Sequence, residues 1–168
     1  DYSAPYVVDL DAGAVKMVSA SFDGDAYPDL AIVHDTAAGY TVLRGSASGV
    51  VSKIPLASAG EAVHSVDSGD FDGDGKNDLV LGSQTNPKTI FLKGVGDGTF
   101  TALGTATPEF NGVRGVRLGD TDGDGDLDLA VSAWSDVRWN TFVNNGSGAF
   151  AGRTSYNVGA AAFDLYLE

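Results

Sequence analysis

Residues 119–129 read GDTDGDGDLDL, and aspartate occupies every second position of this stretch from Asp120 to Asp128. Carboxylates packed so closely repel one another, so a compensating interaction is needed if the stretch is to be ordered. Two related stretches precede it, SFDGDAYPDLA at residues 21–31 and GDFDGDGKNDLV at residues 69–80. The acidic stretch is therefore one of three copies, and the comparison of these copies decides the fold.

The three copies recur at a nearly constant spacing. Their central residues Asp23, Asp72 and Asp122 are 49 and then 50 residues apart. In each copy the last aspartate leads into an apolar run, which is LAIV, LVLG or LAVS. Sixteen residues after that aspartate a turn opens, with the sequence GSASG, GVGDG or NNGSG. A fixed period near 50 residues indicates a repeat architecture.

Each copy is predicted to form four short strands. In the middle copy, residues 62–71 alternate between apolar and polar, and residues 78–82 are almost entirely apolar. Residues 89–93 and 99–106 follow, separated by turns rich in Gly, Asn and Asp. Because no stretch shows a convincing helical periodicity, we expect an all-β chain. Four-stranded units of this length are typical of β-propeller blades, here with the acidic loop between the first and second strand of each blade.

The whole chain, residues 1–168, is predicted to be a single repeat domain. Its repeats span about 12–58, 62–108 and 112–157, and a partial repeat spans 158–168. Closed propellers need at least four blades, so three alternatives stay open. The chain is part of a larger ring, or several copies complete a ring by self-association, or the repeats stack as an open array. The final Leu167-Glu168 belongs to the last repeat or is a remnant of a removed tag.

Composition narrows the class of protein. The chain has 168 residues, 43% of them hydrophobic, which suffices for a sizeable core, and its 23 glycines favour many tight turns. A formal net charge of −13 argues against nucleic acid and anionic membranes as partners. No apolar run suggests membrane insertion and no signal peptide is visible. Because the chain contains no cysteine, disulfides and thiolate metal sites are excluded.

The aspartates of each loop are spaced for a metal ion. In a tight loop, carboxylates at positions 1, 3, 5 and 9 and the carbonyl of position 7 converge as hard oxygen ligands, which suits Ca²⁺. A bound cation would also offset the repulsion among the carboxylates. An EF-hand begins in the same way, but it needs a Glu at position 12 and flanking helices. That position is Leu81 or Val131 here, inside an apolar strand, so the EF-hand is excluded.

The pattern D-x-D-G-D-G-x-x-D-L, leading straight into a strand, resembles the calcium loops of FG-GAP and VCBS repeats, which form integrin-α-type propellers. The resemblance covers nearly the whole chain as three units. It implies two calcium sites, with these ligands: Asp70, Asp72, Asp74, the Lys76 carbonyl and Asp78 in the second loop, and Asp120, Asp122, Asp124, the Asp126 carbonyl and Asp128 in the third.

The first loop departs from this pattern. Position 1 is Ser21, a neutral ligand, and position 6 is Ala26 instead of glycine. The remaining ligands implied by the resemblance are Asp23, Asp25, the Tyr27 carbonyl and Asp29. Because calcium affinity follows ligand charge and site rigidity, we expect a third, weaker site here. The three loops hold 12 of the 23 acidic residues, and three Ca²⁺ ions would change the net charge from −13 to −7.

No catalytic constellation is visible. A calcium ion held by four carboxylates and a carbonyl is nearly saturated, whereas a catalytic metal keeps an open position. His34 and His64 lie in different repeats without metal-binding spacing, and no serine lies in G-x-S-x-G. We therefore expect neither catalytic nor cofactor-binding residues.

Both tryptophans fall in one predicted loop of the third repeat, AWSDVRWN at residues 133–140. Exposed tryptophan beside polar residues suits sugar stacking or a protein hot spot, which makes Trp134, Asp136, Arg138 and Trp139 candidate ligand-binding residues. The alternative is that these tryptophans pack between blades.

Proteins with such repeats are commonly adhesive or carbohydrate-recognising. The resemblance therefore implies a calcium-stabilised, non-catalytic binding or adhesion module, lectin-like and secreted or at the cell surface, with a glycan or a cell-surface protein as partner. Weak calcium sites are typical of extracellular modules, which agrees with this location. Two alternatives stay open, a non-catalytic propeller segment of a larger secreted enzyme and a purely structural repeat.

Overall fold

The computed structural model of the chain is all-β in the residues it describes, which are 7–36, 38–49, 51–83, 85–86, 88–106, 112–133, 138–157 and 159. Three sheets of four antiparallel strands follow one another along the chain. The first holds β1 Ala14–Ala20, β2 Asp29–His34, β3 Gly39–Arg44 and β4 Ser52–Ser58. The second holds β5 Val63–Gly69, β6 Asp78–Ser83, β7 Lys88–Gly94 and β8 Phe100–Ala106. The third holds β9 Val113–Gly119, β10 Asp128–Ala133, β11 Arg138–Val143 and β12 Ala151–Asn157.

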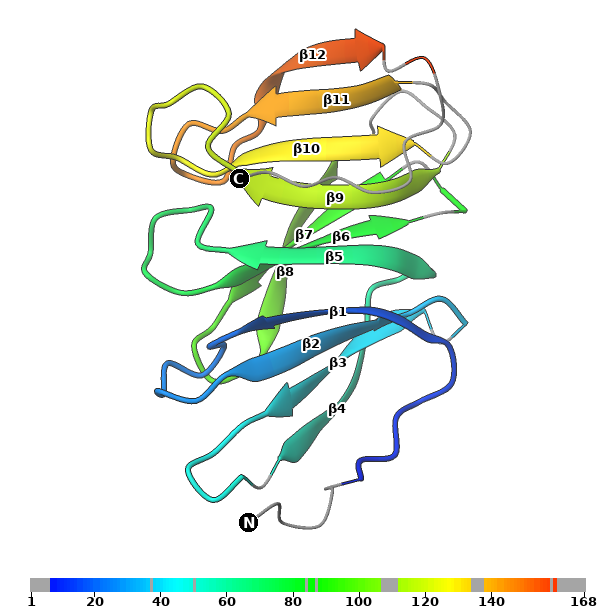
Figure 1. Cartoon of the computed structure of the whole chain (residues 1–168), viewed down its shortest axis with the longest axis vertical. Coiled ribbons are helices and arrows are strands. Elements are labelled where there is room, and N and C mark those ends of the chain that lie inside the picture. The colour runs from blue at the N-terminus through cyan, green and yellow to red at the C-terminus, as the bar shows by residue number, and fades with distance from the viewer. Residues whose placement is uncertain are drawn as a thin grey trace.

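Each sheet is a simple meander, because its strands pair in chain order. The first strands of the three sheets lie next to one another, β5 between β1 and β9, and the other strands fan outward from them (Figure 1). This arrangement confirms the predicted all-β fold with propeller-type blades. The partial repeat predicted at 158–168 lies outside the described residues, except for Gly159.

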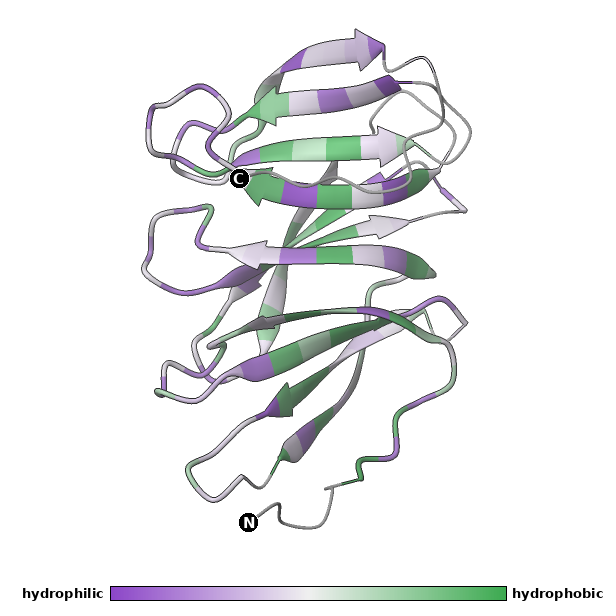
Figure 2. Cartoon of the chain, in the orientation of Figure 1, coloured by the Kyte–Doolittle hydropathy of each residue, from purple (hydrophilic) through white to green (hydrophobic). Residues whose placement is uncertain are grey.

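Burial follows the position of each strand in its sheet. Every residue of β6 and β10 is buried, as expected for apolar strands covered on both faces. All residues of β12, the outer strand of the third sheet, are exposed. In Figure 2, β10 is hydrophobic along most of its length, whereas β9 alternates between hydrophobic and hydrophilic residues.

The core consists of two layers of side chains between successive sheets. Val42 of the first sheet packs with Val66 and Leu79 of the second, and Phe91 of the second sheet packs with Val116 and Leu129 of the third. In each layer, an aromatic side chain from the later sheet also packs against the earlier sheet. Phe100 contacts Phe22 and Tyr40 edge-on, at ring-centroid distances of 5.4 and 5.8 Å.

The second layer repeats this arrangement. Phe150 lies edge-on to Phe71 at 5.5 Å and stacks on Phe91 at 4.7 Å with an interplanar angle of 12°. Such aromatic contacts add to the free energy gained by burying apolar area. These aromatic contacts therefore fix the position of each sheet relative to the next.

The three acidic loops connect the first and second strands of their sheets, as predicted, and they lie along the same edge of the molecule (Figure 1). The turns between the third and fourth strands lie at that edge as well. Among the described residues, no helix has the length and apolar character needed to cross a membrane.

We predict that the second layer of side chains is needed for stability. Replacing Phe91, which is 6% exposed, by alanine removes its contacts with Phe71 and Phe150. The free energy of unfolding, measured by urea denaturation, should fall by about 3–5 kcal/mol. Leu103→Ala is the matched control, because Leu103 lines the same surface depression as Phe91 but is 48% exposed. This control should change the stability by less than about 0.5 kcal/mol; equal losses would contradict the assignment of Phe91 to the core.

Candidate metal centre

One buried aspartate ends each acidic loop and ties it to the rest of its sheet. Asp29, Asp78 and Asp128 open β2, β6 and β10, and all three are fully buried. In each, Oδ2 accepts a hydrogen bond from the N–H of the second loop residue, at distances of 2.7 Å for Phe22, 3.2 Å for Phe71 and 2.9 Å for Thr121.

The other oxygen of the same carboxylates accepts an N–H from the turn between the third and fourth strands. These bonds come from Gly45 at 2.9 Å and from Gly94 and Asn144 at 2.8 Å. The buried aspartate therefore joins two segments that lie seven residues before it and sixteen residues after it. This bond accounts for the constant sixteen-residue spacing observed in the sequence.

The second and third loops are further ordered by their first aspartate. Oδ1 of Asp70 accepts the N–H of Gly73 at 2.8 Å, and Oδ2 accepts that of Gly75 at 2.8 Å. Asp120 accepts the N–H groups of Gly123 and Gly125 in the same way, at 2.7 and 3.1 Å. These four glycines have positive φ angles, between 77° and 96°, which few other residues adopt without strain.

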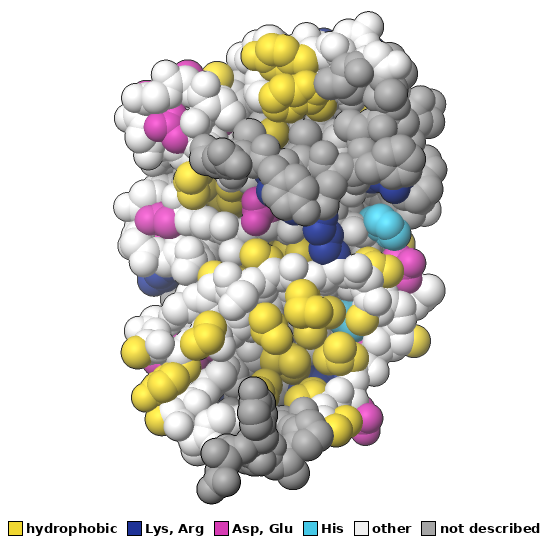
Figure 3. Space-filling model, in the orientation of Figure 1, with side chains coloured by type: hydrophobic (Ala, Val, Ile, Leu, Met, Phe, Trp, Pro, Cys, Tyr) yellow, Lys and Arg dark blue, Asp and Glu magenta, His cyan; other side chains and the backbone are white. Residues whose placement is uncertain are grey.

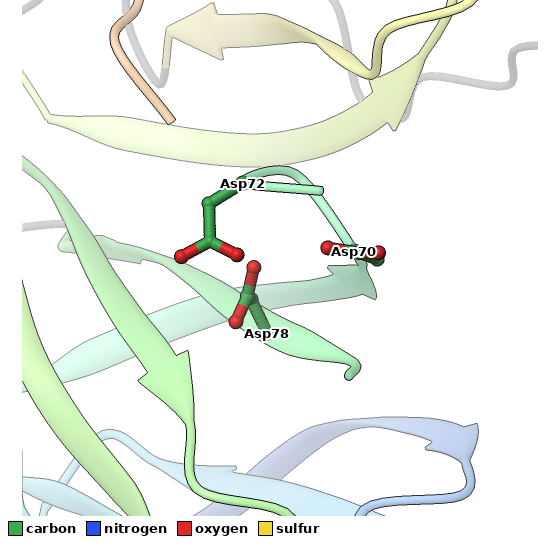
Figure 4. Close-up of side chains that lie close together, drawn as sticks. All are labelled: Asp70, Asp72 and Asp78. Atoms are coloured by element: carbon green, nitrogen blue, oxygen red, sulfur yellow. The ribbon is translucent and has the colours of Figure 1, made fainter. Parts of the chain in front are cut away.

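The geometry brings three carboxylates together in each of these two loops. In the second loop, oxygens of Asp70, Asp72 and Asp78 lie within 4.8 Å of one another (Figure 4). In the third loop, Asp120, Asp122 and Asp124 form such a group. All the donors are oxygens, which suits a hard divalent cation such as Ca²⁺. The residues that are present therefore fit the expected ion.

The remaining predicted ligands lie in the same loops but outside these groups. Asp74 of the second loop and Asp128 of the third are not members of these groups. Asp128 differs from Asp78 in also accepting a hydrogen bond from the Thr121 hydroxyl. The carbonyl groups predicted to bind the metal belong to the seventh residue of each loop. The N–H of this residue donates a hydrogen bond to the carboxylate at the fifth position. The distances are 2.7 Å for Tyr27 on Asp25, 3.0 Å for Lys76 on Asp74 and 2.9 Å for Asp126 on Asp124.

The first loop differs at its first position. The hydroxyl of Ser21 donates a hydrogen bond to the Asp25 carbonyl at 3.0 Å, whereas Asp70 and Asp120 accept glycine N–H groups. Within the part of the chain that the structure describes, the groups of three acidic side chains that could share one ion lie in the second and third loops. The first loop therefore remains the weakest candidate, as its sequence predicts.

A lysine supplies positive charge to the second loop. The Lys93 ammonium contacts Oδ2 of Asp72 directly and lies 3.0 Å from Oδ2 of Asp74. Lys93 is the last residue but one of β7, and the equivalent residue of the third sheet is Val143, which carries no charge. In the first sheet the equivalent Arg44 donates to the Asp97 carbonyl of the next sheet at 3.4 Å. The second loop therefore contains its own partial substitute for a metal cation.

The pKa values reflect these environments. Burial, with a contribution from the charges of Asp72 and Asp74, raises the pKa of Asp78 to about 6. Burial acts in the same direction on Asp128, but the hydrogen bonds from the Thr121 hydroxyl and from the Asn144 and Thr121 N–H groups outweigh it and lower its pKa. The hydrogen bond from Lys93 lowers the pKa of Asp74. In the third loop, burial and the neighbouring charges of Asp124, Asp128 and Asp120 raise the pKa of Asp122. Each of the two metal-free loops therefore holds one carboxyl group that resists ionisation.

The structure corrects one prediction about the tryptophan-containing stretch. Arg138 and Trp139 were expected in a loop, but they open strand β11, where they pair with Asn157 and Tyr156 of β12. Cross-strand pairing of residues 138–143 with both neighbours extends the strand into the expected loop. The other two candidates, Trp134 and Asp136, lie outside the described residues. The two histidines lie within β2 and β5, and the His34 ring is fully buried with Nε2 3.0 Å from the Thr41 hydroxyl.

Sequence reasoning missed Lys93 and Tyr156. One feature of the sequence could have indicated the contact of Lys93 with the second loop. In the first two repeats a basic residue stands at the equivalent position, directly before the turn. Tyr156 had none, because its partner Trp139 lies 17 residues earlier and their alignment follows from strand register alone.

The fold and the loops together define the class of protein. It consists of propeller-type repeats whose acidic loops are suited to bind a metal ion. A comparison with protein families identifies the repeats. The FG-GAP-like repeat matches residues 22–81 and 70–131, which together exceed half of the chain. The chain therefore belongs to the FG-GAP-like repeat family, whose repeats are typically non-catalytic modules of extracellular or cell-surface proteins. A search among curated proteins found no match.

We predict that Lys93 stabilises the metal-free protein. Lys93→Met removes the ammonium from Asp72 and Asp74 and leaves their charges uncompensated, so the melting temperature in chelator and low salt should fall. Lys76→Met is the matched control, since the Lys76 side chain is 46% exposed and its ammonium lies 3.8 Å from Oδ2 of Asp74. It should lower the melting temperature less, and added salt should narrow the difference between the variants. An equal fall in both would show that Lys93 has no special role.

We also predict that Asp78 and Asp128 titrate far apart in the metal-free protein. Carbon NMR of the carboxyl groups in chelator should give a midpoint near pH 6 for Asp78 and one below the usual aspartate range for Asp128. Since the pKa of Asp78 is higher in the folded than in the unfolded chain, its contribution to stability is full below about pH 4 and is lost as the pH rises to about 6. Coincident midpoints for the two groups would contradict the difference in their environments.

Proposed function

We propose that this chain is a calcium-stabilised, non-catalytic binding module of an extracellular or cell-surface protein, and that it recognises carbohydrate. One observation carries the calcium part of this proposal, namely a group of three close carboxylates in each of the second and third loops, which share their first and third loop positions. Family membership supports it, since FG-GAP repeats often bind Ca²⁺.

The proposed ligands are those of the sequence motif. They are Asp70, Asp72, Asp74, the Lys76 carbonyl and Asp78 in the second loop, and Asp120, Asp122, Asp124, the Asp126 carbonyl and Asp128 in the third. When bound, the ion supplies positive charge that offsets the repulsion among these carboxylates. In the second loop it competes with the Lys93 ammonium for Asp72 and Asp74. The third loop lacks that ammonium and is the more dependent on calcium.

The proposed extracellular location rests on the family, whose repeats are typical of extracellular or cell-surface proteins. Calcium is abundant outside cells, so even a weak site such as the first loop would be filled there. Each buried aspartate accepts two backbone N–H groups, so the loops have a structural role. A structural role of this kind supports a binding module better than a catalytic one.

We predict that calcium raises the melting temperature. At a calcium concentration one hundred times Kd, each occupied site should stabilise the fold by about 2.7 kcal/mol, which corresponds to a rise of about 5–10 °C per site in a domain of this size. Differential scanning calorimetry with calcium and with chelator measures this shift. Identical melting curves would rule out structural calcium.

A pair of variants in the third loop locates the ion. Asp122→Ala removes a proposed ligand, whereas Asp126→Ala removes the same charge but keeps the carbonyl that is proposed as a ligand. Isothermal titration calorimetry with Ca²⁺ should show one site fewer in Asp122→Ala and an unchanged number of sites in Asp126→Ala. Loss of a site in both variants would mean that net charge, and not coordination, governs binding.

A further inference from the structure

The outer face of the third sheet is equivalent to the faces through which the first and second sheets each contact the next sheet. In β10, Leu129 and Val131 pack toward the second sheet, so the alternate residues lie on the opposite face. Strand pairing places Thr141 opposite Ala130, Trp139 opposite Ser132 and Tyr156 opposite Trp139, which puts these side chains on that outer face. In the repeat, Trp139 is equivalent to Tyr40, and Thr141 to Val42 and Phe91.

In the first two sheets this face carries an apolar floor that receives an aromatic ring. Phe22, Tyr40 and Val42 lie under Phe100 of the next sheet. Phe71 and Phe91 lie under Phe150. Small depressions remain beside these rings, of about 80 Å³ at Phe100 and 220 Å³ at Phe150. The apolar floor and the inserted ring together form each joint between sheets.

On the third sheet two positions of this floor are polar. Thr121 replaces the phenylalanine of the other loops, and Thr141 replaces Val42 and Phe91. No further sheet lies over this face in the described residues, and it holds a pocket of about 520 Å³, which we call the Trp139 pocket and which is lined chiefly by Asp120, Thr121, Trp139, Thr141 and Tyr156. Closing it with an aromatic ring would cover polar groups that such a ring cannot satisfy, which costs free energy. The pocket is therefore poorly suited to receive a further sheet of the same kind.

The walls of the Trp139 pocket are suited to a polyhydroxylated ligand. Trp139 and Tyr156 stack at 4.7 Å with an interplanar angle of 24°, and they form an aromatic wall on which the C–H face of a sugar ring can lie. On the other side, each oxygen of the exposed Asp120 carboxylate accepts one glycine N–H and keeps a second lone pair, so that one oxygen can accept a sugar hydroxyl while the other binds Ca²⁺. The Thr121 hydroxyl donates to Asp128 and keeps lone pairs free to accept. Figure 3 shows hydrophobic side chains at the surface over β11 and β12.

We propose that the Trp139 pocket is a carbohydrate-binding site in which a pyranose ring packs against the wall formed by the Trp139–Tyr156 pair while its hydroxyls bond to Asp120, Thr121 and Thr141. This inference rests on the proposed function of a binding module and names its site. An aromatic wall with a few convergent polar groups is the usual composition of a small-ligand pocket. The site adjoins the third calcium loop through Asp120, so its shape depends on that loop being ordered.

The test is NMR chemical-shift mapping of the ¹⁵N-labelled protein in calcium-containing buffer, titrated with the methyl glycosides of glucose, galactose, mannose, fucose and N-acetylglucosamine. At least one glycoside should shift the amide signals of residues 118–121, 139, 141 and 156 in a saturable way. Tyr156→Ala should weaken that affinity about tenfold, and Thr141→Val about fivefold. Thr105→Val, beside the equivalent depression of the second sheet, is the matched control and should leave the affinity unchanged.

Three results would overturn the inference. These are no saturable shift with any glycoside, shifts confined to other residues, or shifts that Tyr156→Ala and Thr141→Val leave unchanged. Concentration-dependent shifts of the same amides without sugar would show instead that a second copy of the chain occupies the pocket. Calcium titration of the same sample separates the two proposals, because calcium binding without sugar binding overturns this inference alone.

Discussion

The hydrogen-bonded buried aspartate is the interaction on which each sheet depends. Asp29, Asp78 and Asp128 have no contact with water, and a buried carboxylate is tolerated only when its oxygens are satisfied. Each of them bonds to two backbone N–H groups, one from the acidic loop and one from a distant turn. The acidic loop is thereby fixed at one edge of the sheet, which brings the remaining carboxylates close together.

Placing several carboxylates at one edge creates an electrostatic cost that the three repeats meet differently. The first reduces the charge, with Ser21 at the start of its loop. The second sets the Lys93 ammonium against Asp72 and Asp74. The third keeps five aspartates with Val143 in place of the lysine. One backbone design thus carries three different balances of charge at the same edge of the sheet.

The faces through which the sheets pack also differ among the repeats. The first two use an apolar floor and an inserted aromatic ring, and this contact orders the sheets relative to one another. On the third sheet threonines replace the apolar floor, while Trp139 and Tyr156 add a stacked aromatic wall. A face that joins sheets in one repeat is thereby converted into a pocket in another, with no change in the pairing of its strands.

The sequence by itself determined the repeat, the all-β fold, the position of the acidic loops and the residues within them, because these depend on local spacing, turn chemistry and apolar periodicity. It did not reveal that Asp78 and Asp128 differ in pKa, that Lys93 reaches Asp72, or that Trp139 lies on a strand and stacks on Tyr156. Those features depend on strand register and on contacts between segments distant in the chain. They are fixed by the packing of the sheets, since similar local motifs acquire different neighbours there.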